Sequence, residues 1–241
     1  MDQKVRAQVL FNSEAVLSGL STGWGLSFLL DDRILFDTAD NPENLLGNMK
    51  RLKIDPFLID TVIISHDHWD HTGGLTGLLK INPKMRIYIC SGYTREFAEK
   101  TAEYKDRLIL SDKLTKITEN VFLTGKFDGT YKGKNMPEQA VIVRQGNLLT
   151  VLTGCAHPGI VYMLRMIKKM FPGDKINSIF GGFHLLDKDE KVIDIIIEKF
   201  RQMGIMSVGP THCSGLYAQE AFKKEYKDAY VELPAGAVVM V

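Results

Sequence analysis

A mixed α/β fold is predicted for this chain, and three observations lead to the prediction. The 241 residues are 45% hydrophobic and 24% charged, which is an ordinary composition for a globular protein with a large core. Apolar runs joined by short polar turns are typical of antiparallel hairpins. Elsewhere, apolar strands alternate with segments of helical periodicity, which is typical of a mixed sheet covered by helices. We therefore expect one domain over residues 1–241.

The strands of the antiparallel part are expected at the two ends of the chain and in two hairpins. Each hairpin consists of two apolar runs around a short turn, residues 26–30 with 33–36 and residues 140–144 with 148–153. Residues 5–9 alternate between apolar and polar side chains, as a half-buried strand does. Val238 and Val239 are expected to lie in the last strand.

Helices and further strands alternate between these hairpins. Asn41 and Pro42 favour a helix start, and Leu45 and Met49 follow at helical spacing. The other segments with these patterns are helices over 91–103, 160–171 and 192–203, and strands over 61–64, 86–90, 176–180 and 207–208. Residues 125–134 are expected to form a long loop.

Charge, length of apolar runs and cysteine count exclude several classes of protein. Thirty basic and twenty-nine acidic residues give a net charge of +1, which argues against binding to nucleic acid or to an anionic membrane. The segment Met1–Val5 lacks the pattern of a signal segment, and no apolar run reaches the roughly 20 residues of a membrane span. Three widely spaced cysteines do not predict disulfide bonds. We expect a cytoplasmic protein with a small-molecule substrate, and a homo-oligomer stays open.

The first three histidines lie in one segment directly behind the apolar strand at 61–64. Residues 65–74 read Ser-His-Asp-His-Trp-Asp-His-Thr-Gly-Gly. Imidazole and carboxylate groups are common ligands of borderline divalent metals. A solvated polar loop is the alternative interpretation, but three histidines and an aspartate within six residues favour a metal site.

The other three histidines, His157, His184 and His212, each follow an apolar strand and lie among glycines. Strand ends at one edge of a sheet are where α/β enzymes assemble their sites. Each histidine alone would more often be a hydrogen-bonded structural residue. Because all three share this context in a chain with a metal motif, we expect them near the metal.

Residues 65–75 resemble the signature of the metallo-β-lactamase-fold superfamily, and the run 34–38 resembles its strand that ends in an aspartate. The segments around the three later histidines are similar to one branch, which is related to the archaeal 7,8-dihydropterin-6-yl-methyl-4-(ribofuranosyl)aminobenzene 5′-phosphate synthases. The resemblance implies an αββα four-layer sandwich with a centre of one or two metal ions. Zinc, as two ions, is the implied cofactor, with manganese, iron and magnesium open.

The resemblance also implies a role for individual residues. His66, His68 and His157 are expected to bind the first metal, and Asp70, His71 and His212 the second. Asp37 is expected to brace the ligand loop, with Asp67 and Cys155 beside the ligands. The expected catalytic residues are Asp70 and His184, the latter as a proton donor to substrate or as a further ligand.

Two features depart from the superfamily pattern. No histidine lies between His71 and Cys155, where the third motif is expected, so His157 is the substitute ligand. Cys155 stands where a bridging aspartate is usual, which removes one negative charge unless its thiol ionises. One unit charge 4 Å away is worth about 4 kcal/mol at an effective dielectric of 20. The implied substrate is therefore anionic, such as a phosphate or pyrophosphate ester.

The expected function is that of a hydrolase in which metal-bound hydroxide attacks a small anionic substrate. One alternative is the chemistry of the branch, transfer of a dihydropterin methyl carbon with release of pyrophosphate. Another is a non-catalytic metal or ligand sensor with a saturated metal. Lys126, Tyr131 and Lys132 are candidates for clamping the substrate, and a solvated loop is the alternative for them.

Overall fold

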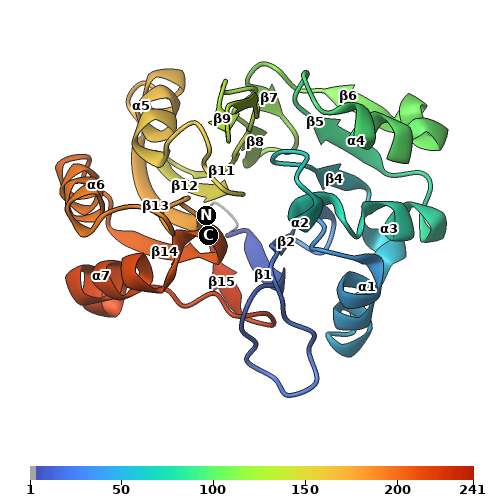
Figure 1. Cartoon of the computed structure of the whole chain (residues 1–241), viewed down its shortest axis with the longest axis horizontal. Helices are drawn as coiled ribbons and strands as arrows, with labels where there is room; N and C mark the ends of the chain where they lie inside the picture. The colour runs from blue at the N-terminus through green and yellow to red at the C-terminus, as the bar shows by residue number, and fades with distance from the viewer. Residues whose placement is uncertain (1–3) are drawn as a thin grey trace. The chain divides into compact units, whose positions relative to one another are not determined.

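The computed structural model describes residues 4–241 (Figure 1). Residues 1–3, where we expect no signal segment, lie outside the described residues. The chain divides into two compact units, which we call unit 1 (Lys113–Glu232) and unit 2 (Lys4–Asp112 with Leu233–Val241). Each unit has its own main sheet and its own hydrophobic core. The single domain over residues 1–241 stays a prediction.

The sheet of unit 2 has seven strands in the order β15-β1-β2-β3-β4-β5-β6. The expected first hairpin is present, since β2 and β3 are antiparallel and the turn residues Asp31 and Asp32 have φ of 46° and 57°. Leu30 pairs with Ile34, so Asp31, Asp32 and Arg33 connect the strands, and positive φ at two consecutive turn residues is typical of a type I′ turn. The bounds are β1 (Arg6–Phe11), β2 (Ser27–Leu30), β3 (Ile34–Phe36), β4 (Thr61–Ile63), β5 (Arg86–Ile89), β6 (Leu108–Leu110) and β15 (Val238–Met240).

Strands β3 to β6 of this sheet are parallel, so their carboxyl ends share one edge. Asp37 directly follows β3, and the histidine-rich segment 65–71 follows β4. Two sequence segments almost thirty residues apart are thereby brought to neighbouring strand ends.

Six short helices complete unit 2. The expected helix start is confirmed, because Asn41 accepts a hydrogen bond from the Asn44 N–H and Pro42 begins α1. The helix expected over 91–103 is shorter, since Gly92 has a positive φ and Thr94 caps the helix late. The bounds are α1 (Pro42–Arg51), α2 (Trp69–Thr72), α3 (Leu75–Ile81), α4 (Arg95–Lys100), and the 3-10 helices η1 (Pro56–Leu58) and η2 (Ala102–Arg107).

The main sheet of unit 1 has six strands in the order β14-β13-β12-β11-β8-β7. The expected second hairpin is confirmed as the antiparallel pair β11–β12, and β12, β13 and β14 are parallel. The loops that follow these three parallel strands hold His157, His184 and His212 at one edge of the sheet. The bounds are β7 (Thr115–Lys116), β8 (Val121–Leu123), β11 (Val141–Gln145), β12 (Leu148–Thr153), β13 (Lys175–Gly182) and β14 (Ser207–Thr211).

Helices α5, α6 and α7 lie along one flank of strands β12–β14 (Figure 1). Phe183, Phe200 and Phe222 are fully buried there, with ring centroids 5.3 to 5.6 Å apart. The bounds are α5 (Ile160–Met170), α6 (Glu190–Gln202), α7 (Leu216–Tyr226), η3 (His212–Ser214) and η4 (Lys227–Ala229). Within residues 4–241, every helix is too short or too polar to span a bilayer.

The long loop expected over 125–134 is wrong in part, because the segment ends in a hairpin. Strands β9 (Thr130–Tyr131) and β10 (Lys134–Asn135) pair across the turn Lys132-Gly133, whose φ values are 48° and 75°. The expectation failed because each strand is two residues long and polar, which is too short for an alternating pattern to be visible.

Candidate metal centre

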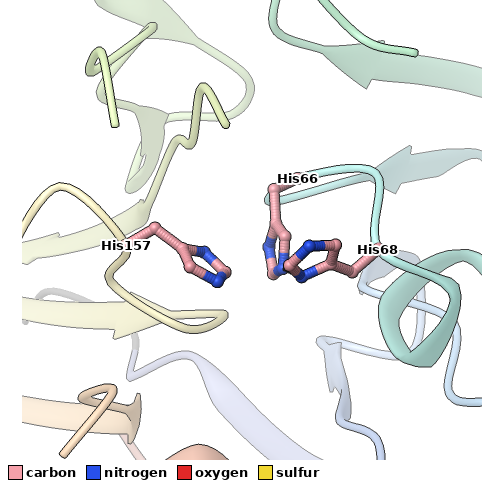
Figure 2. A group of neighbouring side chains, drawn as sticks. All are labelled: His66, His68 and His157. Carbon is pink, nitrogen blue, oxygen red and sulfur yellow. Dashed lines mark hydrogen bonds between the residues drawn. The ribbon is translucent and has the colours of Figure 1, made fainter. Parts of the chain in front are cut away.

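Four metal-ligand side chains of unit 2 converge at the end of β4. Figure 2 shows His66 and His68 on this loop with neighbouring rings, and His66 Nε2 lies 3.1 Å from His68 Nδ1. The His66 and His71 ring centroids are 4.2 Å apart. His71 Nε2 lies 3.5 Å from the Asp70 carboxylate. The segment therefore brings its expected ligands together within the unit.

Asp37 is fully buried behind these ligands and holds two of them. Its carboxylate accepts hydrogen bonds from the Ser65 N–H at 2.7 Å, the Ser65 hydroxyl at 2.8 Å and His71 Nδ1 at 2.7 Å. Because the Ser65 hydroxyl donates to Asp37, its oxygen accepts from His66 Nδ1, which lies 2.8 Å away. Both rings thus direct Nε2 away from Asp37. The bracing role expected for Asp37 has this geometric basis.

The charge around His71 is strongly negative. Burial by itself would lower the pKa of His71, but the carboxylates of Asp37 and Asp70 outweigh it and hold the pKa well above its usual value. The imidazole is fully buried, so these charges are poorly screened. The two carboxylates thus favour a positive charge at this position.

Two glycines allow the histidine loop to pack closely. A Cβ at Gly73 would lie 1.8 Å from the Asp40 carbonyl oxygen, and one at Gly74 would lie 2.3 Å from that of Thr38. The Gly73 and Gly74 N–H groups bond to the carbonyls of Ala39 and Thr38. Backbone approach this close excludes any side chain. The two glycines behind His71 are therefore part of what positions the ligands.

Unit 1 contains a second group of possible ligands. The ligand atoms of Cys155, His157 and His184 all lie within 4.8 Å of one another, and so do those of Cys155, His212 and Cys213. His157 projects from the loop after β12, as Figure 2 shows. Together with the group in unit 2, these residues account for all six histidines of the chain. The structure gathers each predicted ligand with others in its own unit.

Glu138 is a member of the unit 1 group that the sequence analysis missed. Its Oε1 accepts hydrogen bonds from the N–H groups of Cys155 at 2.9 Å and Ala156 at 2.7 Å. Its Oε2 accepts from the N–H of His157 at 2.8 Å and from its Nδ1 at 3.0 Å. Burial would raise the pKa of Glu138, but the bonds from His157, Ala156 and Cys155 lower it to about 2. In the sequence, Glu138 is recognisable only as a charged residue shortly before the apolar strand β11.

His184 lies beside His157, with ring centroids 4.5 Å apart. A hydrogen bond with Cys213 raises the pKa of His184. Burial would raise the pKa of Cys213, but bonds with Cys155 and His184 lower it well below its usual value. Among the described residues, His184 Nδ1 is buried without a hydrogen-bond partner, as a nitrogen that awaits a ligand would be.

Four residues of the two groups adopt left-handed backbone conformations, with φ of 61° at Asp37 and Ala156, 53° at His184 and 52° at His212. Such values are uncommon for residues other than glycine and cluster at functional sites. Each of them follows the end of a strand directly or within three residues. The strained backbone therefore lies in the turns after the strands, next to the candidate metal ligands.

Tyr131 of the β9–β10 hairpin lies against the two histidines of unit 1. Its ring centroid is 5.3 Å from that of His157 and 5.7 Å from that of His184. Lys132 Nζ lies 5.0 Å from the centre of the Tyr131 ring. Two of the three predicted substrate residues are thus near predicted ligands, whereas Lys126 forms an ion pair with Asp128 at 3.5 Å.

Asp67, expected beside the ligands, accepts a hydrogen bond from the N–H of Thr94, the residue that caps α4. Cys155, the other expected neighbour of the ligands, is buried within the unit 1 group.

The side chains present fit a divalent metal ion. Imidazole nitrogen, thiol sulfur and carboxylate oxygen are the ligand types of zinc. Histidines that ligate metals usually donate their second nitrogen to a carboxylate or a carbonyl, and His71 and His157 both do so. The buried Nδ1 of His184 offers a further ligand atom.

Comparison with known proteins agrees with this chemistry. A family model for the metallo-beta-lactamase superfamily matches residues 25–161. The chain is 30% identical over 263 aligned positions to the 7,8-dihydropterin-6-methyl-4-(beta-D-ribofuranosyl)-aminobenzene-5′-phosphate synthase of Methanocaldococcus jannaschii, and the alignment covers 89% of each chain.

Solved structures with the same fold include a metal-dependent hydrolase and a tRNase. A metal-dependent hydrolase of the beta-lactamase superfamily matches with a TM-score of 0.80 and 30% identity, over 98% of this chain and 99% of that one. The short form of human tRNase Z matches with a TM-score of 0.62 and 16% identity, over 98% and 99% of the two chains. At that identity the second likeness concerns the fold alone.

Proposed function

Because the chain belongs to the metallo-beta-lactamase superfamily, we propose that it is a metal-dependent hydrolase that acts on a small anionic substrate. Two zinc ions are the proposed cofactor. The proposed ligands are the residues that the resemblance implies: His66, His68 and His157 for one ion, and Asp70, His71 and His212 for the other.

The observation that supports this proposal most strongly is the carboxylate behind a histidine in each unit. Asp37 accepts a hydrogen bond from His71 Nδ1, and Glu138 accepts one from His157 Nδ1. In both pairs Nε2 is left as the ligand atom, and both carboxylates are fully buried. A divalent ion bound by such ligands lowers the pKa of a coordinated water to near neutrality and so supplies a nucleophile.

The remaining residues of unit 1 suggest how a substrate is held. Tyr131 offers an aromatic face beside His157 and His184, and Lys132 adds a positive charge at that face. Cys155 adds no negative charge unless its thiol ionises. These features favour a substrate with a phosphate or pyrophosphate group. His184 is the proposed proton donor to the leaving group, because its pKa is raised and its ring is near His157.

A second candidate function is group transfer. The relative from Methanocaldococcus jannaschii is named as a synthase, and the alignment covers most of both chains. A transferase would use the same anion-binding residues but would join two organic substrates. The two functions differ in product, because only hydrolysis incorporates oxygen from water.

Metal analysis tests the ligand proposal. We expect His66→Ala, and the double variant Asp70→Ala/His71→Ala, to lose metal while the protein still unfolds cooperatively. The matched control is Trp69→Tyr, because Trp69 lies between the ligands in sequence but its side chain is 56% exposed. Full metal content in both ligand variants would contradict the assignment.

Turnover is tested on phosphodiesters, lactones, thioesters and pterin pyrophosphates in ¹⁸O-labelled water. Label in the product supports the hydrolase, and an unlabelled product that joins two substrates supports the transferase. No turnover together with a coordinatively saturated metal would support a sensor instead.

We also expect competitive inhibition by inorganic phosphate, which Cys155→Asp should weaken if the thiol is neutral. Inhibition that is absent at tens of millimolar would contradict an anionic substrate.

A further inference from the structure

We propose that Glu138 is a positioning residue that fixes His157 in the tautomer with its proton on Nδ1, so that Nε2 is the metal-binding atom. The proposal rests on the proposed function in one respect only, which is that His157 binds a metal. It also separates the roles of two neighbouring histidines, since it makes His157, and not His184, the permanent ligand.

The contacts of Glu138 show that its carboxylate acts as a hydrogen-bond acceptor. Both oxygens are occupied by N–H donors, three from the consecutive backbone groups of Cys155, Ala156 and His157 and one from the His157 ring. The carboxylate is fully buried, and the His157 side chain is almost so. A buried carboxylate with four donors has no proton to give. His157 Nδ1 must therefore be the donor of the bond that joins it to Oε2.

The same contacts keep the ring in place as well as the proton. The backbone N–H and the Nδ1 of His157 bind the same oxygen, at 2.8 and 3.0 Å. The ring is thereby tied to its own backbone through one atom of Glu138. Such a closed arrangement restricts rotation of the side chain and presents Nε2 in one direction, as a preorganised ligand requires.

His184 has no comparable support in the part of the chain that the structure describes. Its Nδ1 is buried without a hydrogen-bond partner. No carboxylate fixes which nitrogen of this ring carries the proton. Of the two neighbouring rings, His157 is therefore the one whose proton position is fixed by a carboxylate.

The proposal is tested first in metal-free protein without substrate, by long-range ¹H–¹⁵N spectra of the histidine rings above the usual pH range of imidazole titration. In the wild-type protein we expect the proton of His157 on Nδ1. Glu138→Gln places an amide N–H₂ group against the ring, so we expect the proton to move to Nε2. Glu138→Asp retains a carboxylate and should restore the Nδ1 proton. The matched control is Glu119→Gln, an exposed glutamate of the same unit.

Zinc affinity is the second measurement. We expect Glu138→Gln to weaken zinc binding about 10- to 100-fold, as loss of a partner behind a ligand does. His157→Ala should weaken it at least as much, and His184→Ala much less. A wild-type His157 with its proton on Nε2 overturns the proposal even if no variant folds. So does a Glu138→Gln variant that binds zinc as tightly as the wild type, or a larger loss from His184→Ala than from His157→Ala.

Because the tautomer is read without metal or substrate, its result is independent of the hydrolytic function. A fixed tautomer in a protein without turnover would leave Glu138 as a positioning residue and reject only the proposed reaction.

Discussion

His71 lies between two carboxylates, and this position leads us to expect that a metal ion displaces a proton when it binds. Its pKa is held well above the usual value by Asp37 and Asp70, against the effect of burial. The metal-free protein therefore binds a proton on this ring more tightly than a free imidazole does, and a metal ligand must be unprotonated. We expect zinc binding to release a proton from His71. Calorimetric titrations in buffers of different ionisation enthalpy measure this proton.

The same shift fixes the sign of a stability effect in metal-free protein. A group whose pKa is raised in the folded state stabilises the protein at a pH below the unfolded-state pKa, which is about 6.5 for histidine. This stabilisation is lost as the pH rises through the folded-state pKa. Metal-free protein should therefore lose stability on the alkaline side, and Asp37→Asn should weaken this dependence, since Asp70 remains beside His71. Unfolding curves that run parallel for the two proteins at every pH would contradict the expectation.

Most ligand candidates could be predicted from sequence because their chemistry is local. Histidines at 66, 68 and 71 with Asp70 are recognisable by residue type and spacing alone. Glu138 could not be found in this way. It acts through the turn at 155–157, which lies in a separate segment, and only the pairing of β11 with β12 brings the two together.

At the scale of elements, the close packing of the histidine loop leads to a prediction on glycine. Gly73→Ala would place a methyl group 1.8 Å from the Asp40 carbonyl oxygen. We expect this variant to lose at least about 2 kcal/mol of unfolding free energy and part of its metal. The matched control is Gly47→Ala in α1, where the nearest atom is 3.9 Å away. It should gain about 0.5–1 kcal/mol instead.

The β9–β10 hairpin provides a second prediction at this scale. If the Tyr131 face and its lysine hold an anionic group, Lys132→Ala should raise KM about 3- to 10-fold, since a partly exposed charge contributes on the order of 1 kcal/mol. Lys134→Ala, in β10 next to the same turn, should leave KM unchanged. Equal effects of the two substitutions would indicate a general charge effect in place of a specific contact. Steady-state kinetics at two salt concentrations distinguish these outcomes.

Elements with strong periodicity were predicted well, and weak ones were not. α1, α5 and α6 follow from apolar residues at helical spacing, and α1 also has an identifiable start at Asn41. By contrast, α7 begins with the exposed Leu216 and Tyr217 and buries only every fourth residue, so its pattern is diluted. The two-residue strands β7, β9 and β10 owe their existence to partners and turns that a local pattern does not reveal.

For the whole molecule, the prediction of one domain can be tested through its two cores. Phe200 is fully buried in unit 1, and Phe200→Ala should cost about 3–5 kcal/mol of unfolding free energy. In a single cooperative domain the same substitution also shifts the unfolding of unit 2. Trp24 and Trp69, the two tryptophans of the chain, both lie in unit 2, so their fluorescence reports on that unit.

Hydrogen exchange in strands β11–β14 reports on unit 1 in the same experiment. We expect the fluorescence transition of Phe200→Ala to move together with the loss of protection in these strands. A fluorescence transition at the wild-type position would show that the two units unfold separately, and would contradict the single-domain prediction.

The class of the fold followed from sequence because hairpins and strand–helix alternation leave few architectures. The parallel order of β3 to β6 and of β12 to β14 was not readable from sequence. It depends on which strands pair over distances of 21 residues or more (Ile87 with Leu108 is the shortest), and apolar patterns say only that a strand is buried. Strand order decides which loops become neighbours, and therefore which donors can meet.

The left-handed backbone at His184 and His212 also limits how this protein can change over generations. Glycine, asparagine and aspartate tolerate such a conformation, whereas β-branched residues adopt it at a high cost. A lineage that gave up either histidine would therefore pass most easily to one of those three residues. Asparagine and aspartate keep an oxygen donor in nearly the same place. Substitutions at these two positions are thus expected to change the metal preference of the site more readily than to introduce an apolar side chain.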